Sequence, residues 1–125
     1  MLKKKLSIII SITVVILLFS FALACNGSFA NSRKIDVVYE FGGSAKEVSI
    51  TYSNKNGDTE QRNGIKNNQS IQFQDVPINT FLYISSQNQT DSGTIVVSIL
   101  VNGKEWKSSE SSGAYAIATA SGIYR

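Results

Sequence analysis

Residues 93–122, GTIVVSILVNGKEWKSSESSGAYAIATASG, decide the fold of this chain. The segment opens with eight residues rich in β-branched side chains, 94–101, which favour an extended strand. Asn102 and Gly103 follow, and both tolerate the positive φ that a two-residue type I′ hairpin turn requires. A second apolar run, 114–120, comes after a Ser/Gly-rich loop. The segment therefore has the pattern of antiparallel strands, and it carries no visible catalytic chemistry.

The hairpin turn also predicts which residues face each other across the two strands. With two residues in the turn, Val101 pairs with Lys104 and Ile99 pairs with Trp106. Side chains alternate between the two faces of a strand. One face of the hairpin is therefore expected to hold Ile95, Val97, Ile99, Lys104 and Trp106.

The residues before this segment form short runs bounded by turn residues, which is the usual pattern of an all-β domain. We expect strands at 35–41, 47–52, 59–63, 71–76 and 81–84, the last apolar on both sides and therefore central. Two sheets packed face to face are the arrangement that such short strands favour. The predicted fold is an all-β, Ig-like antiparallel β-sandwich of seven to eight strands, with Tyr115 as a candidate tyrosine corner.

Residues 1–24 have the features of an export signal that precedes this domain. Three lysines open the segment, a largely apolar run follows, and Ala22-Leu23-Ala24-Cys25 ends it. Small residues at Ala22 and Ala24 suit a signal peptidase, with cleavage between Ala24 and Cys25. The same four residues resemble the bacterial lipobox, in which the cysteine receives a lipid. Cys25 is the only cysteine of the chain, and it stands at the lipidation position.

Three alternatives follow for this segment: a lipoprotein signal, an uncleaved membrane anchor, or the signal of a fully secreted protein. The anchor stays open because an apolar run of about 18 residues can span a bilayer. Each alternative places the C-terminal part outside the cytoplasm. For a lipoprotein we expect a signal peptide at 1–24, a tether at 25–34 and the β-sandwich at 35–125. A diacylglycerol on Cys25, with acyl chains such as palmitate, would hold the protein at the extracytoplasmic face of a bacterial cell membrane.

Cleavage before residue 25 would remove the excess of positive charge. The whole chain carries 12 basic and 9 acidic residues, and three of the lysines lie in the signal. From Cys25 onward 9 basic and 9 acidic residues remain, so the net charge is zero before the termini are counted. A nucleic-acid partner is therefore not expected, because it would need a cluster of basic side chains. A second thiol for an internal disulfide is also absent from the sequence.

Catalytic and metal-binding chemistry is not indicated. The chain has no histidine, which is the commonest general base and a common metal ligand. None of its serines lies in a nucleophile motif, and no glycine-rich phosphate loop occurs. We therefore expect neither an enzyme nor a cofactor. Asp58, Asp75 and Asp91 are expected to cap turns, with a weak calcium site as the alternative.

Trp106 is the only tryptophan, and two roles are open for it. It packs against Ile99 across the hairpin, or it forms an exposed interaction surface together with Lys104 and Lys107. The second role would make these three residues the candidate binding surface of the domain.

Five stretches of the domain carry a resemblance to a known family. They are VYEFGGS (38–44), VSITY (48–52), SQN (86–88), ILVNGK (99–104) and GAYA (113–116). Together, and in this order, they resemble the MmpS family of small membrane proteins over roughly residues 37–122. The resemblance implies a membrane-anchored extracytoplasmic β-sandwich, and an accessory role beside large RND-type (MmpL) exporters of lipids and siderophores.

The chain departs from that family at three points. The family has cysteines where this chain has Val97 and Ala120, which implies that the two positions lie close together. A Pro-Trp pair is absent from residues 65–73, and a lipid anchor replaces the usual transmembrane helix. We therefore expect a lipid-anchored, non-catalytic accessory protein that assists an RND-type transporter or envelope assembly. A surface binding or adhesion module for an extracellular ligand is the alternative.

Overall fold

The computed structural model describes residues 33–125, so the predicted signal at 1–24 and the predicted lipidation site Cys25 lie outside the described residues. Every regular element of the described part is a strand. The strands are β1 Lys34–Gly42, β2 Glu47–Ser53, β3 Thr59–Lys66, β4 Gln69–Pro77, β5 Phe81–Asn88, β6 Thr94–Val101, β7 Lys104–Ser112 and β8 Ile117–Ile123. Among residues 33–125, no helix long and apolar enough to cross a membrane is found.

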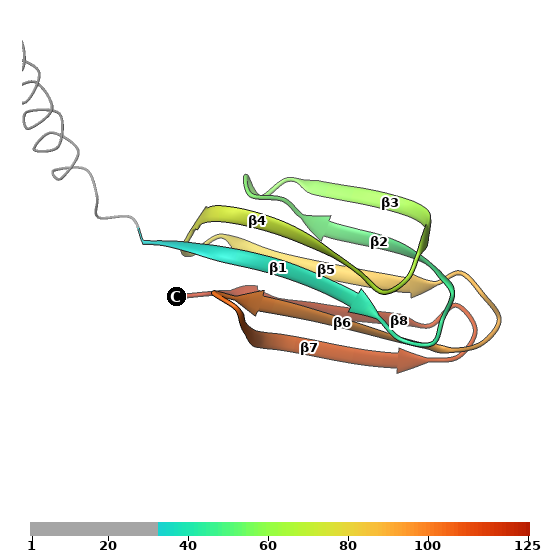
Figure 1. Cartoon of the computed structure of the whole chain (residues 1–125). Coiled ribbons are helices and arrows are strands. Elements are labelled where there is room, and N and C mark those ends of the chain that lie inside the picture. The colour runs from blue at the N-terminus through green and yellow to red at the C-terminus, as the bar shows by residue number, and fades with distance from the viewer. Residues whose placement is uncertain (1–32) are drawn as a thin grey trace, which may run out of the picture. The chain divides into compact units, whose positions relative to one another are not determined.

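The eight strands form two four-stranded sheets, and all paired neighbours are antiparallel. One sheet has the order β4-β1-β6-β7 and the other has the order β3-β2-β5-β8. Figure 1 shows the strands running along the length of the domain, with turns at its two ends. The predicted all-β, Ig-like antiparallel sandwich is confirmed, and β5 lies inside its sheet as the sequence predicted. The β6–β7 hairpin lies between β5 and β8 in the chain but belongs to the opposite sheet.

The core lies between the two sheets and follows the alternation of side chains along each strand. In β1, β2, β5 and β6 every second residue is buried, and of the residues between them only Ser53 and Ser98 are buried as well. The fully buried large side chains are Val37, Tyr39, Val48, Ile50, Tyr52, Val76, Leu82, Ile84, Ile95, Val97 and Ile99. Both sheets contribute to this set, so neither sheet can keep its inner face out of water without the other.

The β6–β7 hairpin confirms the predicted turn and corrects the predicted register. Asn102 has φ 50° and Gly103 has φ 82°, as a type I′ turn requires, and Val101 pairs with Lys104. The predicted pairing of Ile99 with Trp106 is wrong, because Ile99 pairs with Lys107. The register shifts at this point, so Trp106 is the extra residue of a β-bulge.

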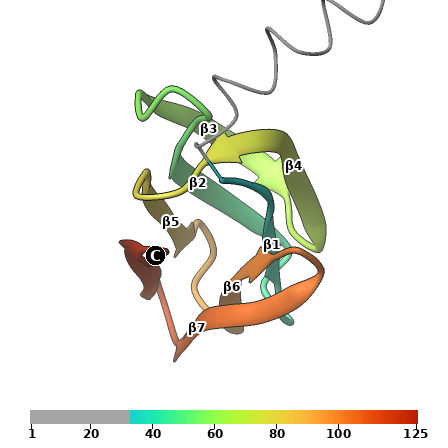
Figure 2. The same cartoon turned by 90° about the vertical axis from the view of Figure 1, so that its left-hand side faces the viewer.

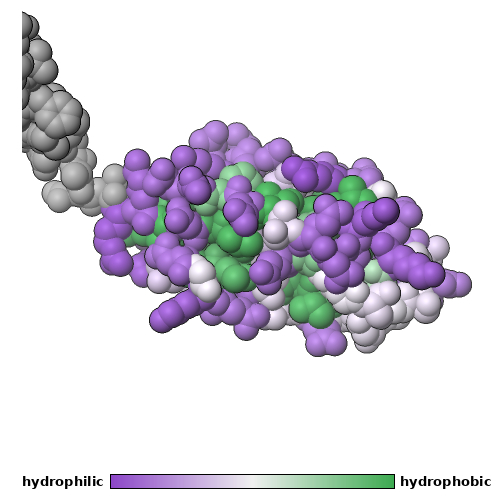
Figure 3. Space-filling view, in the orientation of Figure 1, coloured by the Kyte–Doolittle hydropathy of each residue, from purple (hydrophilic) through white to green (hydrophobic). Residues whose placement is uncertain are grey.

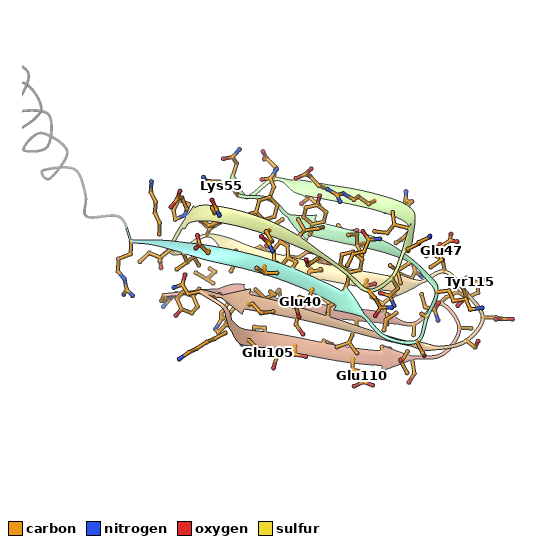
Figure 4. The ribbon with its side chains drawn as sticks, viewed as in Figure 1. Glu40, Glu47, Lys55, Glu105, Glu110 and Tyr115 are labelled. Atoms are coloured by element: carbon orange, nitrogen blue, oxygen red, sulfur yellow. The ribbon has the colours of Figure 1, made fainter. Side chains whose placement is uncertain are left out.

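The predicted tyrosine corner at Tyr115 is also wrong. Tyr115 precedes β8, has φ 55°, and is 60% exposed. Figure 4 shows its side chain at the end of the domain opposite to Lys55, away from the core. The backbone turns at this residue, so its ring cannot join the alternation of β8 and bury its hydroxyl between the sheets.

A different tyrosine, Tyr39 of β1, fastens the two sheets together. Its hydroxyl lies 2.8 Å from the hydroxyl of Ser53, the last residue of β2 in the opposite sheet. The Ser53 hydroxyl donates to the carbonyl oxygen of Phe81 and accepts a hydrogen bond from the backbone N–H of Tyr83. Since Ser53 uses its own proton toward Phe81, Tyr39 is the donor in the bond between the two hydroxyls. The buried junction therefore joins β1, β2 and β5.

Removal of the Tyr39 hydroxyl should destabilise the domain. Tyr39→Phe keeps the ring and leaves the buried Ser53 hydroxyl without one partner, so the free energy of unfolding at pH 7 should fall by about 1–2 kcal/mol. Urea denaturation measures this change. Tyr115→Phe, the same substitution at an exposed position, should change stability by less than about 0.5 kcal/mol. Equal stability of Tyr39→Phe and wild type would contradict the assigned role.

The same variant should respond differently to alkaline pH. Burial raises the pKa of Tyr39 above its ordinary value, and the hydrogen bonds to Ser53 and Tyr83 oppose this shift. Above about pH 10, Tyr39 in the unfolded chain loses its proton before Tyr39 in the folded chain, so stability falls as pH rises. Tyr39→Phe has no ionisable hydroxyl at this position and does not lose stability in this way. The difference in free energy of unfolding between the variant and the wild type should therefore become smaller as pH rises. If the free energies of unfolding of the wild type and of Tyr39→Phe change with pH in parallel, the Tyr39 hydroxyl is not buried and neutral as assigned.

Val97 and Ala120 both lie in the core, on β6 and β8 of opposite sheets. These two strands contact each other across the interior. The short separation between the two positions stays a prediction: their Cα atoms should lie within about 7 Å. Val97→Cys with Ala120→Cys should then form a disulfide spontaneously under oxidising conditions. The closed loop of about 24 residues should add roughly 3 kcal/mol to the free energy of unfolding, less any strain. Thiols that stay reduced under oxidising conditions would contradict the pairing.

Candidate functional site

The structure brings together the three residues that the sequence selected as a binding surface. Lys104 and Trp106 line the same hollow of about 380 Å³, together with Tyr124 from the end of the chain. The ammonium nitrogen of Lys107 lies 5.3 Å from the centre of the Trp106 ring, a cation–π geometry. We call Lys104, Trp106, Lys107 and Tyr124 the Trp106 corner. It combines two aromatic rings with two ammonium groups.

Trp106 is positioned by contacts across the two sheets rather than by its own hairpin. Its ring meets the Tyr124 ring edge-on, with centroids 5.5 Å apart. A Cβ added at Gly122 of β8 would lie only 2.7 Å from the Cη2 atom of Trp106, so this glycine makes room for the indole. The predicted packing of Trp106 against Ile99 is therefore replaced by packing against β8. The ring remains half-buried and reaches the hollow.

A second candidate surface covers the outer face of the sheet β3-β2-β5-β8. The outward-facing residues along the main part of this sheet are Ser49, Thr51, Thr59, Gln61, Asn63, Phe81, Tyr83, Ser85, Gln87, Ile117, Thr119, Ser121 and Ile123. No residue of this described set is charged, and we call the set the uncharged face; the charged residues Glu47 and Lys66, paired at one end of β2 and β3, border it. Phe81, Ile117 and Ile123 are 51%, 56% and 46% exposed. Phe81 and Ile123 are paired neighbours, whereas Ile117 lies near the other end of β8, opposite Gln87. Exposed apolar side chains beside one another, as Phe81 and Ile123 are, are typical of interaction surfaces.

The uncharged face has a hollow near the β2–β3 turn. Phe81 and Tyr83 stack with ring centroids 6.2 Å apart and form one wall. The hollow has a volume of about 310 Å³, and its lining residues are Thr51, Ser53, Gly57, Thr59, Phe81 and Tyr83. Hydroxyl groups and aromatic rings therefore meet at one place on this face.

The uncharged face was not predicted, because residues 81–84 are apolar on both sides of the strand and indicated only that the strand is central in its sheet. In the structure Leu82 and Ile84 are buried, while Phe81 and Tyr83 point outward. Ile123 pairs with Phe81 across β5 and β8, which places two exposed apolar residues side by side. The run Phe81-Leu82-Tyr83-Ile84 is apolar at every position, so the sequence shows neither which side faces outward nor that Ile123 is the partner of Phe81.

The outer face of the other sheet has a different character. Glu40 of β1 and Glu105 and Glu110 of β7 lie on it, as Figure 4 shows. Glu105 accepts a hydrogen bond from the hydroxyl of Ser98 at 3.1 Å. In the view of Figure 3, which keeps the orientation of Figure 1, hydrophilic residues surround a smaller number of hydrophobic ones. The two outer faces therefore differ in charge, and we call this one the acidic face.

The turn acids do not come together. Asp58 lies in the β2–β3 turn, Asp75 near the end of β4, and Asp91 in the β5–β6 loop. Among residues 33–125 no group of three His, Cys, Asp or Glu side chains is arranged to hold a metal ion. The described surfaces present aromatic rings and ammonium groups at the Trp106 corner, and hydroxyl, amide and a few apolar side chains on the uncharged face.

A larger residue at Gly122 should displace Trp106. Gly122→Val places a side chain where the indole lies, so the free energy of unfolding should fall by about 1–3 kcal/mol. The fluorescence of Trp106, the only tryptophan, should shift to the red as the ring moves into water. Ser121→Val, the matched change at the outward-facing neighbour, should leave the emission unchanged. An unshifted emission in Gly122→Val would contradict the assigned packing.

Two comparisons with known proteins identified no relative of this chain. A scan against models of protein families gave no match, and a search of curated proteins gave none. The resemblance to the MmpS family therefore rests on the stretches of sequence alone.

Proposed function

We propose that this protein is a lipid-anchored, extracytoplasmic, non-catalytic accessory protein that assists a membrane transporter of the RND type or envelope assembly. The observation that carries the proposal is the uncharged face with its exposed Phe81, Ile117 and Ile123. Depletion of charge together with exposed aromatic and apolar residues is the compositional mark of an interface core. The face is wide enough to span four strands, which suits a protein partner better than a small ligand.

A lipid anchor on Cys25 would favour a partner that is itself a membrane protein. Cleavage between Ala24 and Cys25 would leave a lipidated Cys25, whose two ester-linked chains hold a protein stably on a bilayer. Only residues 26–33 lie between this cysteine and Lys34, where β1 begins, and the nine Cα–Cα steps from 25 to 34 reach at most about 30 Å. The domain would therefore stay within reach of membrane proteins. Equal numbers of acidic and basic residues from Cys25 onward argue against a nucleic-acid partner.

The alternative is a surface binding module for an extracellular ligand. The hollow on the uncharged face supports it, because the Phe81–Tyr83 stack and the hydroxyls of Thr51 and Thr59 would suit a small ligand with apolar and polar parts. This alternative predicts a soluble ligand or matrix component on the face instead of a membrane protein.

Photo-crosslinking in intact cells tests the proposal. A benzophenone amino acid at Ile117 should crosslink to an integral membrane protein, identified by mass spectrometry, because the uncharged face binds that partner. The same amino acid at Glu40, on the acidic face, should give little of this product. Equal yields at both positions, or a product with a soluble ligand only, would contradict the accessory role and favour the alternative.

Metabolic labelling with a fatty acid tests the lipid anchor in the same cells. A radioactive fatty acid should label the wild-type protein and should not label Cys25→Ala, because that variant lacks the thiol that carries the lipid. In Cys25→Ala the crosslink from Ile117 should also weaken. An unlabelled wild-type protein would refute lipidation, whatever the crosslinking shows.

A further inference from the structure

The Trp106 corner lies at the same end of the sandwich as the start of β1. The backbone N–H of Asn102, in the β6–β7 turn, donates to the carbonyl oxygen of Asp36 at 2.9 Å. The side-chain oxygen of Asn102 accepts from the backbone N–H of Asp36 at 3.0 Å. These two bonds hold the turn beside the third residue of β1. Figure 2 looks onto this end of the domain, which we call the tether end.

The C-terminus also belongs to the tether end. The backbone N–H of Asn79, in the β4–β5 turn, donates to the carbonyl oxygen of Tyr124 at 3.0 Å. Tyr124 in turn packs against Trp106. The start of β1, two turns and the last residues of the chain are therefore joined at one end, while Tyr115 and the β7–β8 loop lie at the other (Figure 4).

Basic side chains outnumber acidic ones around the Trp106 corner. The basic residues at the start of β1, at the start of β7 and at the C-terminus are Arg33, Lys34, Lys104, Lys107 and Arg125. The acidic groups there are Asp36, Asp75, Glu105 and the C-terminal carboxylate. Glu105 lines the hollow of the corner and accepts a hydrogen bond from Ser98. Five basic side chains against four acidic groups leave a small local excess of positive charge, although residues 25–125 together have none.

Half-buried tryptophan and tyrosine beside lysine is the combination that suits the interface of a bilayer with water. The indole and phenol rings have an apolar body and one polar group, which places them at the level of lipid headgroups. Ammonium groups beside them attract anionic headgroups. In the Trp106 corner both kinds of group line or border one hollow at the end of the domain where the tether enters.

We propose that the tether end docks on the membrane surface, with the Trp106 corner in contact with anionic lipid headgroups. This inference rests on the proposed lipidation of Cys25, which would hold β1 within about 30 Å of the bilayer. Because the strands run along the length of the domain (Figure 1), docking at this end turns both outer faces sideways. The uncharged face would then point along the membrane, toward a neighbouring membrane protein.

The single tryptophan makes this contact measurable. The full-length protein, purified with its lipid, is reconstituted into vesicles of phosphatidylcholine alone or of phosphatidylcholine with phosphatidylglycerol, each containing a lipid with a nitroxide on its headgroup. Flotation of the vesicles reports the anchor, and quenching of Trp106 fluorescence reports the corner. We expect stronger quenching with phosphatidylglycerol present. It should weaken at 1 M salt, where the screening length falls to about 3 Å.

Paired lysine variants give the matched control. Lys104→Ser with Lys107→Ser should lose about half or more of the quenching, because the attraction to anionic headgroups is reduced. Lys46→Ser with Lys66→Ser removes two lysines from the opposite end and should leave the quenching unchanged. Circular dichroism confirms that both variants are folded.

The outcomes separate this inference from the proposed function. Protein that floats with the vesicles while Trp106 is not quenched keeps the anchor and overturns the docking. Quenching that is equal in both lipid mixtures, or equal in the two lysine variants, overturns the contact with anionic headgroups. Protein that does not float refutes the lipid anchor, and the docking inference fails with it.

Discussion

The hydrogen bond between Tyr39 and Ser53 is the interaction on which the arrangement of the two sheets depends. Apolar burial is not directional, so it fixes the relative position of two sheets less sharply than a hydrogen bond with defined donor and acceptor does. For a buried hydroxyl pair, a shift of one sheet on the other would leave both groups without partners in a medium that cannot solvate them. The same Ser53 also contacts the backbone of Phe81 and Tyr83, which ties the junction to β5.

A second buried polar residue fixes the loops at the other end. Asn88, fully buried at the end of β5, donates to the carbonyl oxygens of Ser92 and Gly113 at 2.8 and 3.0 Å. Its side-chain oxygen accepts from the backbone N–H of Thr90. The β5–β6 and β7–β8 loops are thereby joined through one amide whose donors and acceptor are all used. With both ends fixed, the outward-facing residues of each strand have defined neighbours, and the two outer faces keep their different chemistry.

The sequence predicted the architecture because the alternation of apolar residues and the Asn102-Gly103 turn are local signals. It failed where the outcome depends on residues far apart in the chain. The bulge at Trp106 reflects room provided by Gly122, and the pairing of Phe81 with Ile123 joins strands about 40 residues apart. Those contacts, rather than the hairpin, decide what Trp106 and the uncharged face present to a partner. Lys104, Trp106 and Lys107 could be selected from their chemistry alone. Their grouping with Tyr124 could not be predicted, because it depends on a contact between segments distant in the sequence.

In the proposed orientation the domain stands upright, with its tether end on the membrane and its uncharged face turned sideways. Paramagnetic relaxation of the backbone amides by a gadolinium-bearing headgroup lipid, measured by NMR on the lipidated protein in bicelles, tests it directly. Docking at the tether end predicts strong relaxation at Asn79 and Asn102, weak relaxation at Gly93 and Gly113, and a steady decline along every strand between them. Relaxation that is strong along the whole of β8 and weak along the whole of β1 would contradict it, because the domain would then lie on its uncharged face.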